Sequence, residues 1–307
     1  MSSSGSTVSV VGAGLAGAAC ARELARLGVP VRVLERGRAP GGRLASPQLH
    51  GRRVDLGAAY FTVRDPEFDA VARRWQAAGL ARPWTDTLYR LAPGESPQAK
   101  PGPMRWAAPD GLRSLARAEL AGIEVQLRMP VTELPDGPTV LAMPDAQAAR
   151  LAAVPEPVDY RPVIAVALAF AQRHWPFADG AFVHGEPLLG FVADDGARRG
   201  DGAPVLVVHS GPELARAHLH EPDGAVAPML AALRGLFELA EPEWTHAHRW
   251  SFAQPAGQHR TTFHLSRSAD GQLLGFAGDQ WCPDGAPRVE AAWRSGTDLA
   301  RAIAASW

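Results

Sequence analysis

Three glycines near the start of the chain have the spacing of a dinucleotide-binding turn: Gly12, Gly14 and Gly17. The first permits a tight strand-to-helix turn, the second lets the backbone approach a pyrophosphate, and the third lets the helix pack closely on the strand. The helix that follows begins at Leu15 and Ala16, where unpaired N–H groups and the positive end of the helix dipole attract phosphates. The pattern therefore predicts a nucleotide-binding site.

A carboxylate and a second glycine-rich loop extend this prediction. Glu35 follows Gly17 by 18 residues and closes the next expected strand, where its carboxylate can accept hydrogen bonds from ribose hydroxyls. Arg36 comes next, and the loop Gly41-Gly42-Arg43 can fold back so that the arginine neutralises a pyrophosphate. The glycine turn and Glu35 fit NAD as well as FAD, whereas the Gly41-Gly42-Arg43 loop that follows favours FAD.

Two further segments favour FAD. Residues 52–56 are expected to form a strand that leads into Gly57 and Ala58, where a flat ring could lie against the backbone. Near the C-terminus, Gly278 and Asp279 follow a strand and precede a helix. A carboxylate there can hold ribityl hydroxyls, and the helix N-terminus can stabilise negative charge on a reduced flavin. Each segment alone also fits an ordinary turn or an N-cap aspartate, but their order along the chain favours FAD.

The elements around these residues predict an α/β fold. A strand at Thr7–Val11, a helix at Leu15–Leu27 and a strand at Val29–Leu34 make a βαβ unit of about 30 residues. Further helices are predicted at Phe68–Ala78, Leu112–Leu120, Val226–Leu236 and Arg288–Ala304. Further strands are predicted at Arg52–Leu56, Ile123–Leu127, Val131–Leu134, Thr139–Met143, Val163–Phe170, Val205–His209 and Leu273–Ala277. Residues 82–105 are interrupted by prolines and show no clear period.

A chain of 307 residues is long enough for two domains. We predict a Rossmann-like FAD-binding domain of the GR2 type, discontinuous over residues 1–75, 110–150 and 265–307. Residues 76–109 and 151–264 carry no nucleotide motif and are predicted to form a second, mixed α+β substrate domain that covers the cofactor.

Composition argues against several other classes of protein. A formal net charge of −1 provides no electrostatic basis for binding nucleic acid or an anionic membrane. The two cysteines, Cys20 and Cys282, make no disulfide framework, and the histidines show no metal-ligand spacing. The first seven residues lack the basic segment of a secretory signal, and no apolar run reaches the roughly 18–20 residues of a membrane span. A cytoplasmic protein without a metal is predicted.

Longer segments resemble the flavin-containing amine oxidase superfamily: the opening GAGLAGAACARELARLG, the ER…GGR loop and VDLGAAYF. More narrowly, residues 57–65 resemble the GAQYFT-x-RD segment of renalases, especially the bacterial ones. Residues 248–253 and the closing run GDQWCPDGAPRVEAAWRSG resemble renalases as well. Ala59 and Gln280 differ from the residues usual in that family, and residues 191–198 lack its NSKPGR pattern.

The resemblance implies an oxidase. Bacterial renalases take hydride from dihydropyridine isomers of NADH that are reduced at ring position 2 or 6, transfer it to flavin N5, and pass the electrons to oxygen to give hydrogen peroxide. Hydride transfer needs a planar donor stacked on the flavin and no acid, base or nucleophile. We therefore expect non-covalent FAD, a 2- or 6-dihydro NAD(P) isomer as the small-molecule substrate, and O2 as the acceptor.

The residues expected at the flavin face and pocket wall are mainly aromatic. Tyr60, Phe61 and Trp250 are the predicted catalytic side chains, and His209, Arg249 and Trp281 are further candidates. Trp250, Trp281 and His209 also fit core positions, and Arg249 fits a partner carboxylate as well as a substrate phosphate. Val131 and Val289 complete the predicted cofactor-binding set.

Two other functions stay open. Many superfamily members that oxidise amines place a lysine near flavin N5, whereas the only lysine here, Lys100, lies in a Pro/Gly-rich segment and is expected to be exposed. Lysine-free amine oxidation or a desaturase-like dehydrogenation remains an alternative, and so does a non-catalytic FAD-binding protein. The sequence does not determine the oligomeric state.

Overall fold

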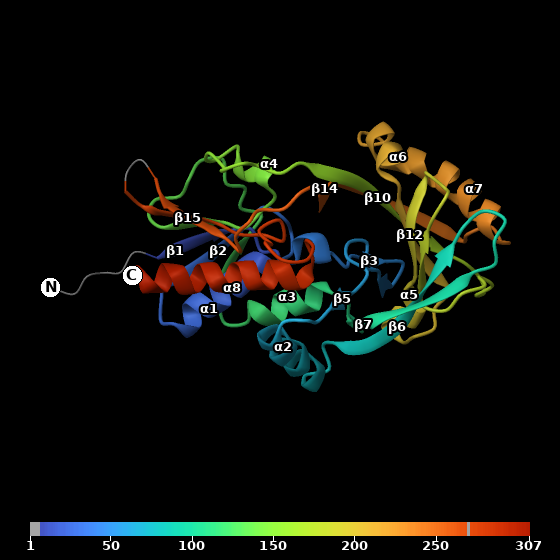
Figure 1. Ribbon diagram of the computed structural model, residues 1–307, viewed down its shortest axis with the longest axis horizontal. Helices are drawn as coiled ribbons and strands as arrows, with labels where there is room; N and C mark the ends of the chain where they lie inside the picture. The colour runs from blue at the N-terminus through green and yellow to red at the C-terminus, as the bar shows by residue number, and fades with distance from the viewer. Residues whose placement is uncertain (1–6, 269–270) are drawn as a thin grey trace.

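The computed structural model describes residues 7–268 and 271–307. One layer is a six-stranded sheet of order β15-β16-β9-β1-β2-β8, seen on the left of Figure 1. Its strands are β1 (Val8–Val11), β2 (Val31–Glu35), β8 (Glu124–Leu127), β9 (Thr139–Leu141), β15 (His264–Arg267) and β16 (Leu273–Phe276). All pairs are parallel except β15–β16. Because β1 and β16 run in the same direction, the turns that follow them lie at one edge of the sheet.

Two helices pack together against this sheet. Figure 1 shows α8 (Val289–Ala305) alongside α1 (Leu15–Arg26). Their contact is close, because a Cβ atom added to Gly296 would lie 2.0 Å from the carbonyl oxygen of Ala16. The core between helices and sheet contains Val10 and Val33 from the strands and Leu299 from α8, all fully buried. The helices α2 (Pro66–Ala77) and α3 (Arg113–Glu119) extend this helical layer.

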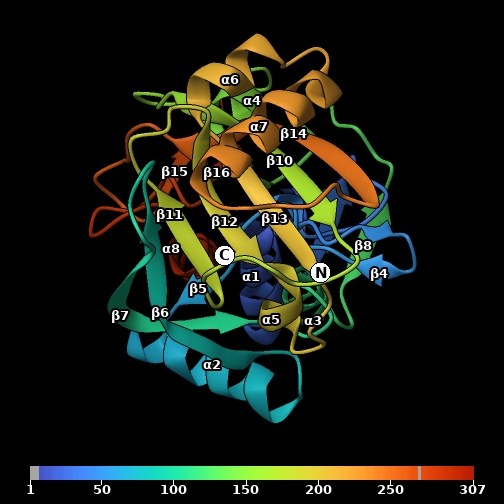
Figure 2. The same cartoon turned by 90° about the vertical axis from the view of Figure 1, so that its right-hand side faces the viewer.

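The other layer is an eight-stranded sheet of order β14-β10-β13-β12-β11-β6-β7-β5. Its strands are β5 (Phe61–Thr62), β6 (Arg82–Leu91), β7 (Gln98–Ala107), β10 (Tyr160–Ala169), β11 (Gly180–Val183), β12 (Leu189–Asp194), β13 (Val205–Ser210) and β14 (Trp244–Pro255). Only the pair β11–β6 is parallel. Figures 1 and 2 show α6 (Pro212–Ala217) and α7 (Val226–Leu236) on one side of this sheet.

The alternation of side chains along β10 explains how the second sheet packs against the segment before Gly57. On β10, Ile164 and Val166 point into the core beneath α7, whereas Ala165 and Ala167 pack on the opposite face. Small residues on that face leave room for Val54 and Leu56, which are fully buried against them. The segment before Gly57 is therefore held directly on the second sheet.

Most of the predicted elements are confirmed, including α1, α2, α3, α7 and α8 and strands β1, β2, β8, β9, β10, β13 and β16. Two predictions are wrong, and one segment without a clear period in the sequence forms strands. That segment, residues 82–105, forms the antiparallel strands β6 and β7; the register shifts after Pro83, where a bulge accommodates a residue with no N–H to donate. Residues 131–134 form no strand, although Val131 and Leu134 pack on a buried cluster. Of residues 52–56, only β4 (Arg52–Arg53) is paired, with β3 (Gln48–Leu49), because burial rather than strand pairing accounts for the apolar residues.

The two-domain division stays a proposal, and the two sheets are its basis. The first six residues, which were part of the prediction that no secretory signal is present, lie outside the described residues. No helix within the described ranges is long and apolar enough to cross a membrane.

Candidate active site

The glycine-rich turn has the geometry that the sequence predicts. Gly12 has φ of 108°, and an added Cβ would lie 2.5 Å from the carbonyl oxygen of Ala142 on the neighbouring strand end. A Cβ on Gly17 would lie 1.9 Å from the carbonyl oxygen of Gly12. Helix α1 begins at Leu15 after Gly14, which provides no side-chain cap. The N–H groups of its first turn, Leu15 and Ala16 included, are therefore available to an anion.

Glu35 lies at the end of β2 and ties two loops together. Its Oε2 accepts the N–H of Ala13 at 2.8 Å, and its Oε1 accepts the N–H of Gly37 at 2.6 Å. Each carboxylate oxygen has a second lone pair, so ribose hydroxyls can still donate to it. Arg36 beside it is exposed. The carboxylate therefore both shapes the turn and fits the adenosine end of a nucleotide.

The loop Gly41–Arg43 folds back onto this turn. The N–H of Gly41 donates to the carbonyl of Ala13 at 2.8 Å, and a Cβ added to Gly42 would lie 3.3 Å from the Cα of Gly14. The Arg43 guanidinium then forms an ion pair with Asp279, donating to Oδ2 at 3.0 Å, and bonds the carbonyl of Ala253 at 3.1 Å. Burial alone would lower the pKa of Arg43, but the Asp279 carboxylate outweighs it and holds that pKa above its ordinary value.

Gly57 connects this loop to the second sheet. A Cβ added to Gly57 would lie 1.9 Å from the carbonyl oxygen of Arg43, and the N–H of Ala58 donates to that oxygen at 2.9 Å. The indole of Trp250, on β14, donates to the carbonyl of Leu56 at 2.8 Å. Segments far apart in sequence therefore meet at Gly57. The loop that carries Arg43 contacts it directly, Asp279 is linked to it through Arg43, and Trp250 binds the preceding residue.

An aromatic wall continues from this point, formed by Tyr60, Trp84, Phe191 and His209. The Tyr60 ring centroid lies 6.1 Å from those of both Trp84 and Phe191, and Phe191 lies 6.1 Å from His209. The guanidinium of Arg105 lies 5.6 Å from the centre of the Tyr60 ring. Of these, sequence reasoning found Tyr60 and His209; Trp84 and Phe191 lie on strands β6 and β12, which it did not predict.

His209 is neutral at neutral pH. Burial, together with the Arg198 guanidinium, lowers its pKa to about 4, although the carbonyls of Leu56 and Gly57 act in the opposite direction. Its Nε2 is buried and has no partner with hydrogen-bond geometry among the described residues. The imidazole therefore adds an uncharged ring to the aromatic wall beside Gly57.

The structure places the other candidates elsewhere. Phe61 is 2% exposed and packs in the α2–α3 core, stacked 6.0 Å from Trp106, so its prediction as a catalytic side chain is wrong. Phe61 is the first residue of β5 and faces the core, whereas Tyr60 precedes the strand and lies beside Trp84 and Phe191. Trp281 is a core residue stacked 3.5 Å from His259. Arg249 is exposed and donates to the carbonyl of Leu219 at 2.6 Å. Val289 is the first residue of α8, and its place in the cofactor-binding set stays a prediction.

A buried charge network, which the sequence did not reveal, holds the backbone on both sides of Gly57. Arg198, on α5 (Asp195–Arg199), has no exposed surface; it donates to the carbonyls of Asp55 and Ala59 at 3.2 Å each and pairs with Asp195. Arg199 pairs with Asp195 at 3.1 Å and with Asp55 at 3.2 Å. Burial favours the neutral form of Asp195, but the arginines outweigh it and lower its pKa. No spacing rule links residues 140 positions apart, so sequence reasoning had no signal for this network.

A second cluster that was not predicted from the sequence includes Gln280, the residue next to Asp279. His259 Nε2 and Asp145, from α4 (Asp145–Ala148), are 2.7 Å apart, and Gln280 Nε2 donates to Asp145 at 2.9 Å. The N–H of Asp145 donates to the Tyr160 hydroxyl at 3.3 Å, and burial raises the pKa of Tyr160. Gln280, the residue unusual for renalases, is fully buried here. Within the described residues, no group of three or more His, Cys, Asp or Glu could hold a metal.

Two family descriptions match the chain. Residues 10–75 match an NAD(P)-binding Rossmann-like domain, and residues 129–304 match flavin containing amine oxidoreductase, more than half of the chain. The chain belongs to the flavin-containing amine oxidoreductase family. It is an oxidoreductase by family, and FAD is the cofactor expected of it. The free N–H groups at α1, the Glu35 carboxylate, the Arg43 loop and the side-chain-free approach at Gly57 fit that cofactor.

Similarity to individual proteins is more distant. The chain is 35% identical over 165 residues to phytoene dehydrogenase of Streptomyces griseus, covering 48% of this chain and 31% of that protein. It is 47% identical over 64 residues to protein FLOWERING LOCUS D of Arabidopsis thaliana, covering 20% of this chain and 8% of that protein. The chain thus spans less than a third of these curated relatives.

Solved structures share the fold at low identity. Cyclohexylamine oxidase from Brevibacterium oxydans IH-35A superposes with a TM-score of 0.76 at 15% identity, over 98% of this chain and 99% of that one. A putative protoporphyrinogen oxidase from Exiguobacterium sp. 255-15 gives 0.75 at 15% identity, over all of both chains. Wild-type putrescine oxidase bound to putrescine gives 0.71 at 16% identity, over 98% and 100%. These likenesses establish the α/β fold with its Rossmann-like FAD-binding domain.

Proposed function

We propose that this chain is a renalase-like oxidase. It takes hydride from 2- or 6-dihydropyridine isomers of NAD(P)H and passes the electrons to O2, forming hydrogen peroxide. The observation that supports this most is the aromatic wall beside Gly57, formed by Tyr60, Trp84, Phe191 and the uncharged ring of His209. A flat, uncharged dihydropyridine suits such a surface, since its ring can stack on aromatic side chains.

Each residue has a separate role in this proposal. The residues predicted to bind FAD are the glycine-rich turn, Glu35, Arg43, Gly57 and Asp279, and the bound flavin would accept the hydride. Tyr60 would hold the plane of the substrate ring, and His209 would contribute an uncharged ring to the same wall. Trp250 binds the Leu56 carbonyl and so orients the segment before Gly57, which makes it a positioning residue.

Amine oxidation is the competing function, because the family is described as amine oxidoreductases. The lysine that many amine oxidases place at the flavin has no counterpart, since the chain's only lysine is the exposed Lys100 on β7. We expect Lys100→Ala to leave the rate of flavin reduction within about threefold of the parent, less than roughly 0.7 kcal/mol in barrier. A hundredfold loss would place Lys100 at the flavin and favour amine oxidation.

Anaerobic flavin reduction tests the proposal directly. NADH isomers reduced at position 2 or 6 should bleach the flavin quickly, and ordinary 4-dihydro NADH slowly or not at all, because stacking brings only some ring carbons within roughly 3–3.5 Å of the acceptor atom. Air should then restore the yellow colour with about one peroxide per isomer consumed. Tyr60→Ala should slow reduction more than it weakens FAD binding. Bleaching by a primary or secondary amine, and by neither isomer, would refute the proposal.

Binding of FAD without any turnover would instead support the non-catalytic alternative. We retain the sequence-based expectations of a cytoplasmic location and of a small-molecule substrate as parts of the proposed function. The oligomeric state is not part of it.

A further inference from the structure

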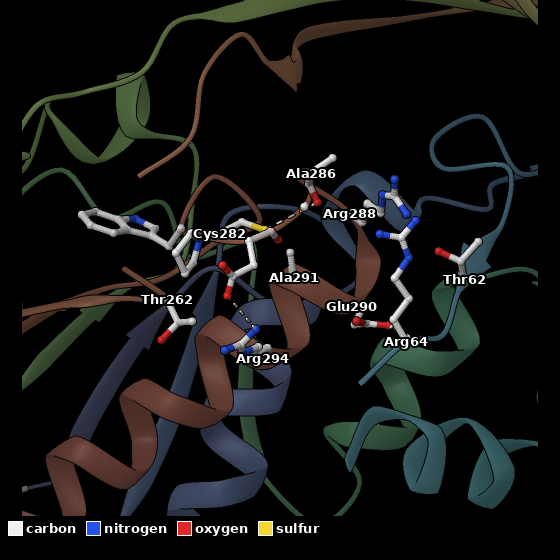
Figure 3. A pocket seen from close by; sticks show the side chains of 13 residues that line it. Thr62, Arg64, Thr262, Cys282, Ala286, Arg288, Glu290, Ala291 and Arg294 are labelled. Carbon is white, nitrogen blue, oxygen red and sulfur yellow. Dashed lines mark hydrogen bonds and ion pairs between the residues drawn. The ribbon is translucent and has the colours of Figure 1, made fainter. Parts of the chain in front are cut away.

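A pocket beside the first turn of α8 contains Arg64 and Arg288, which pair with no carboxylate in the part of the chain that the structure describes. Figure 3 shows this pocket, which is bounded by α8, the loop 282–287 and the chain around Arg64. Its volume is about 50 Å³, and roughly 10–15 Å³ is enough for one water, so a group of several heavy atoms fits. In the view of Figure 3, the guanidinium groups of Arg64 and Arg288 reach the same end of the pocket.

The charges around the pocket do not balance. Its acidic residues are Glu290 and Asp284. Glu290 accepts the backbone N–H groups of Arg64 and Asp65 at 2.7 and 3.2 Å, and Asp284 lies 3.9 Å from Arg294. Within the described residues no carboxylate lies within 4.0 Å of either the Arg64 or the Arg288 side chain. Two guanidinium groups at one pocket, neither of them paired with a carboxylate of the described residues, favour an anion.

We propose that Arg64 and Arg288 form a binding site for a phosphate group. A guanidinium presents paired N–H donors that match phosphate oxygens, which makes arginine the side chain suited to this ligand. The Arg64 guanidinium is held over the loop, with its Nη1 3.9 Å from the position of a Cβ on Gly285. The positive end of α8 faces the same pocket and adds to the attraction, but the site consists of the two arginines.

The phosphate belongs to the dinucleotide substrate. This identification rests on the proposed function: the nicotinamide ring lies at Gly57 and Tyr60, and the same chain leads from Tyr60 to Arg64 within four residues. A dinucleotide carries its pyrophosphate several bonds away from the nicotinamide, so one subsite would hold the ring and another the phosphate. The site would therefore favour dihydropyridine dinucleotides over phosphate-free ribosides.

Calorimetry on the FAD-saturated protein tests the pocket without turnover. Inorganic phosphate and pyrophosphate should bind the parent, and the double variant R64Q/R288Q should raise their Kd about tenfold or more. Arg22→Gln, an exposed arginine on α1 outside the pocket, should leave the Kd unchanged. No binding to the parent, or equal Kd in parent and double variant, would overturn the proposal. Thermal unfolding should show that both variants are folded, since the substituted side chains are exposed.

Steady-state kinetics tests which phosphate is bound. In R64Q/R288Q the KM of the dihydropyridine dinucleotide should rise about tenfold, whereas the KM of the dihydronicotinamide riboside and both kcat values stay unchanged. Equal KM changes for the two substrates would overturn the assignment to the substrate's phosphate. If neither compound reduces the flavin, the proposed function fails while calorimetry still tests the pocket; if both do and calorimetry finds no loss, the pocket alone is wrong.

Discussion

The Glu35 carboxylate holds two backbone N–H groups and is proposed to bind ribose as well. Glu35→Ala should therefore weaken FAD binding at least tenfold, since hydrogen bonds to a charged group contribute roughly 1.5–3 kcal/mol each. Dialysis followed by flavin absorbance measures the bound fraction. Glu124→Ala, an exposed carboxylate on the neighbouring strand β8, is the matched control and should keep its flavin. Full retention of FAD by Glu35→Ala would mean that the adenosine end is placed wrongly.

His209 makes stability depend on pH. Burial and Arg198 lower its folded-state pKa from 6.5 to about 4, so the folded protein keeps the ring neutral where the unfolded chain protonates it. The stability that this residue contributes is complete above pH 6.5 and is lost as pH falls from about 6.5 to about 4. Urea unfolding across that range should show a smaller decrease for His209→Gln than for the parent. Burial raises the pKa of the nearby Asp55, and this second titration is common to both proteins and cancels in the comparison.

Helix α5 is joined to residues 55–59 through buried charges. Asp195→Asn would leave Arg198 and Arg199 without their shared carboxylate, so we expect a loss of about 3–5 kcal/mol in the free energy of unfolding. Asp201→Asn is the control, because Asp201 is half exposed and lies 3.3 Å from Arg52, and it should change stability by less than about 1 kcal/mol. Chemical denaturation measures both. Similar losses in the two variants would show that α5 does not depend on the buried charges.

In the β5–β6–β7 region, the point at which a strand begins determines which way two neighbouring aromatic side chains face. Tyr60 and Phe61 are neighbours in sequence, but β5 starts at Phe61 and directs its ring into the core with Trp106. Tyr60 faces Phe191 and Trp84 instead. The two adjacent aromatic residues therefore belong to different structures, one to the core and one to the proposed substrate surface.

Taken as a whole, the molecule holds the residues proposed for FAD on the six-stranded sheet, on the loops around Arg43 and Gly57, and on helices from both ends of the chain. FAD should therefore stabilise it by mass action, by about 2.7 kcal/mol at a hundredfold excess over Kd, seen as a higher Tm.

The cofactor should leave intact on acid denaturation, because the Cys282 thiol donates to the Asp284 carbonyl at 3.0 Å and burial raises the pKa of that thiol, which keeps it from acting as a nucleophile. Flavin that stays with the polypeptide on a denaturing gel would contradict this, and Cys282→Ser would then test the bond.

The sequence by itself determined the parts that depend on local spacing. The glycine turn and the flanking elements β1, α1 and β2 follow from short-range patterns, because close backbone approach, helix starts and strand burial are each read within a few residues. The membership of a flavin family followed from the same segments. Arg43 and Asp279 were both predicted at the cofactor, but not that they pair with each other.

Only the tertiary structure decided which distant residues meet. Arg198 reaches the carbonyls of Asp55 and Ala59, Phe191 comes beside Tyr60, and Arg288 joins Arg64 at one pocket. The prolines of residues 82–105 interrupt the strand pattern in the sequence. The segment nevertheless forms a hairpin, and its register shifts after Pro83 to form a bulge. These outcomes depend on the packing of the second sheet against the segment before Gly57, where small residues of β10 leave room for Val54 and Leu56. Such packing is a property of surfaces that the folded chain brings together, and no local pattern encodes it.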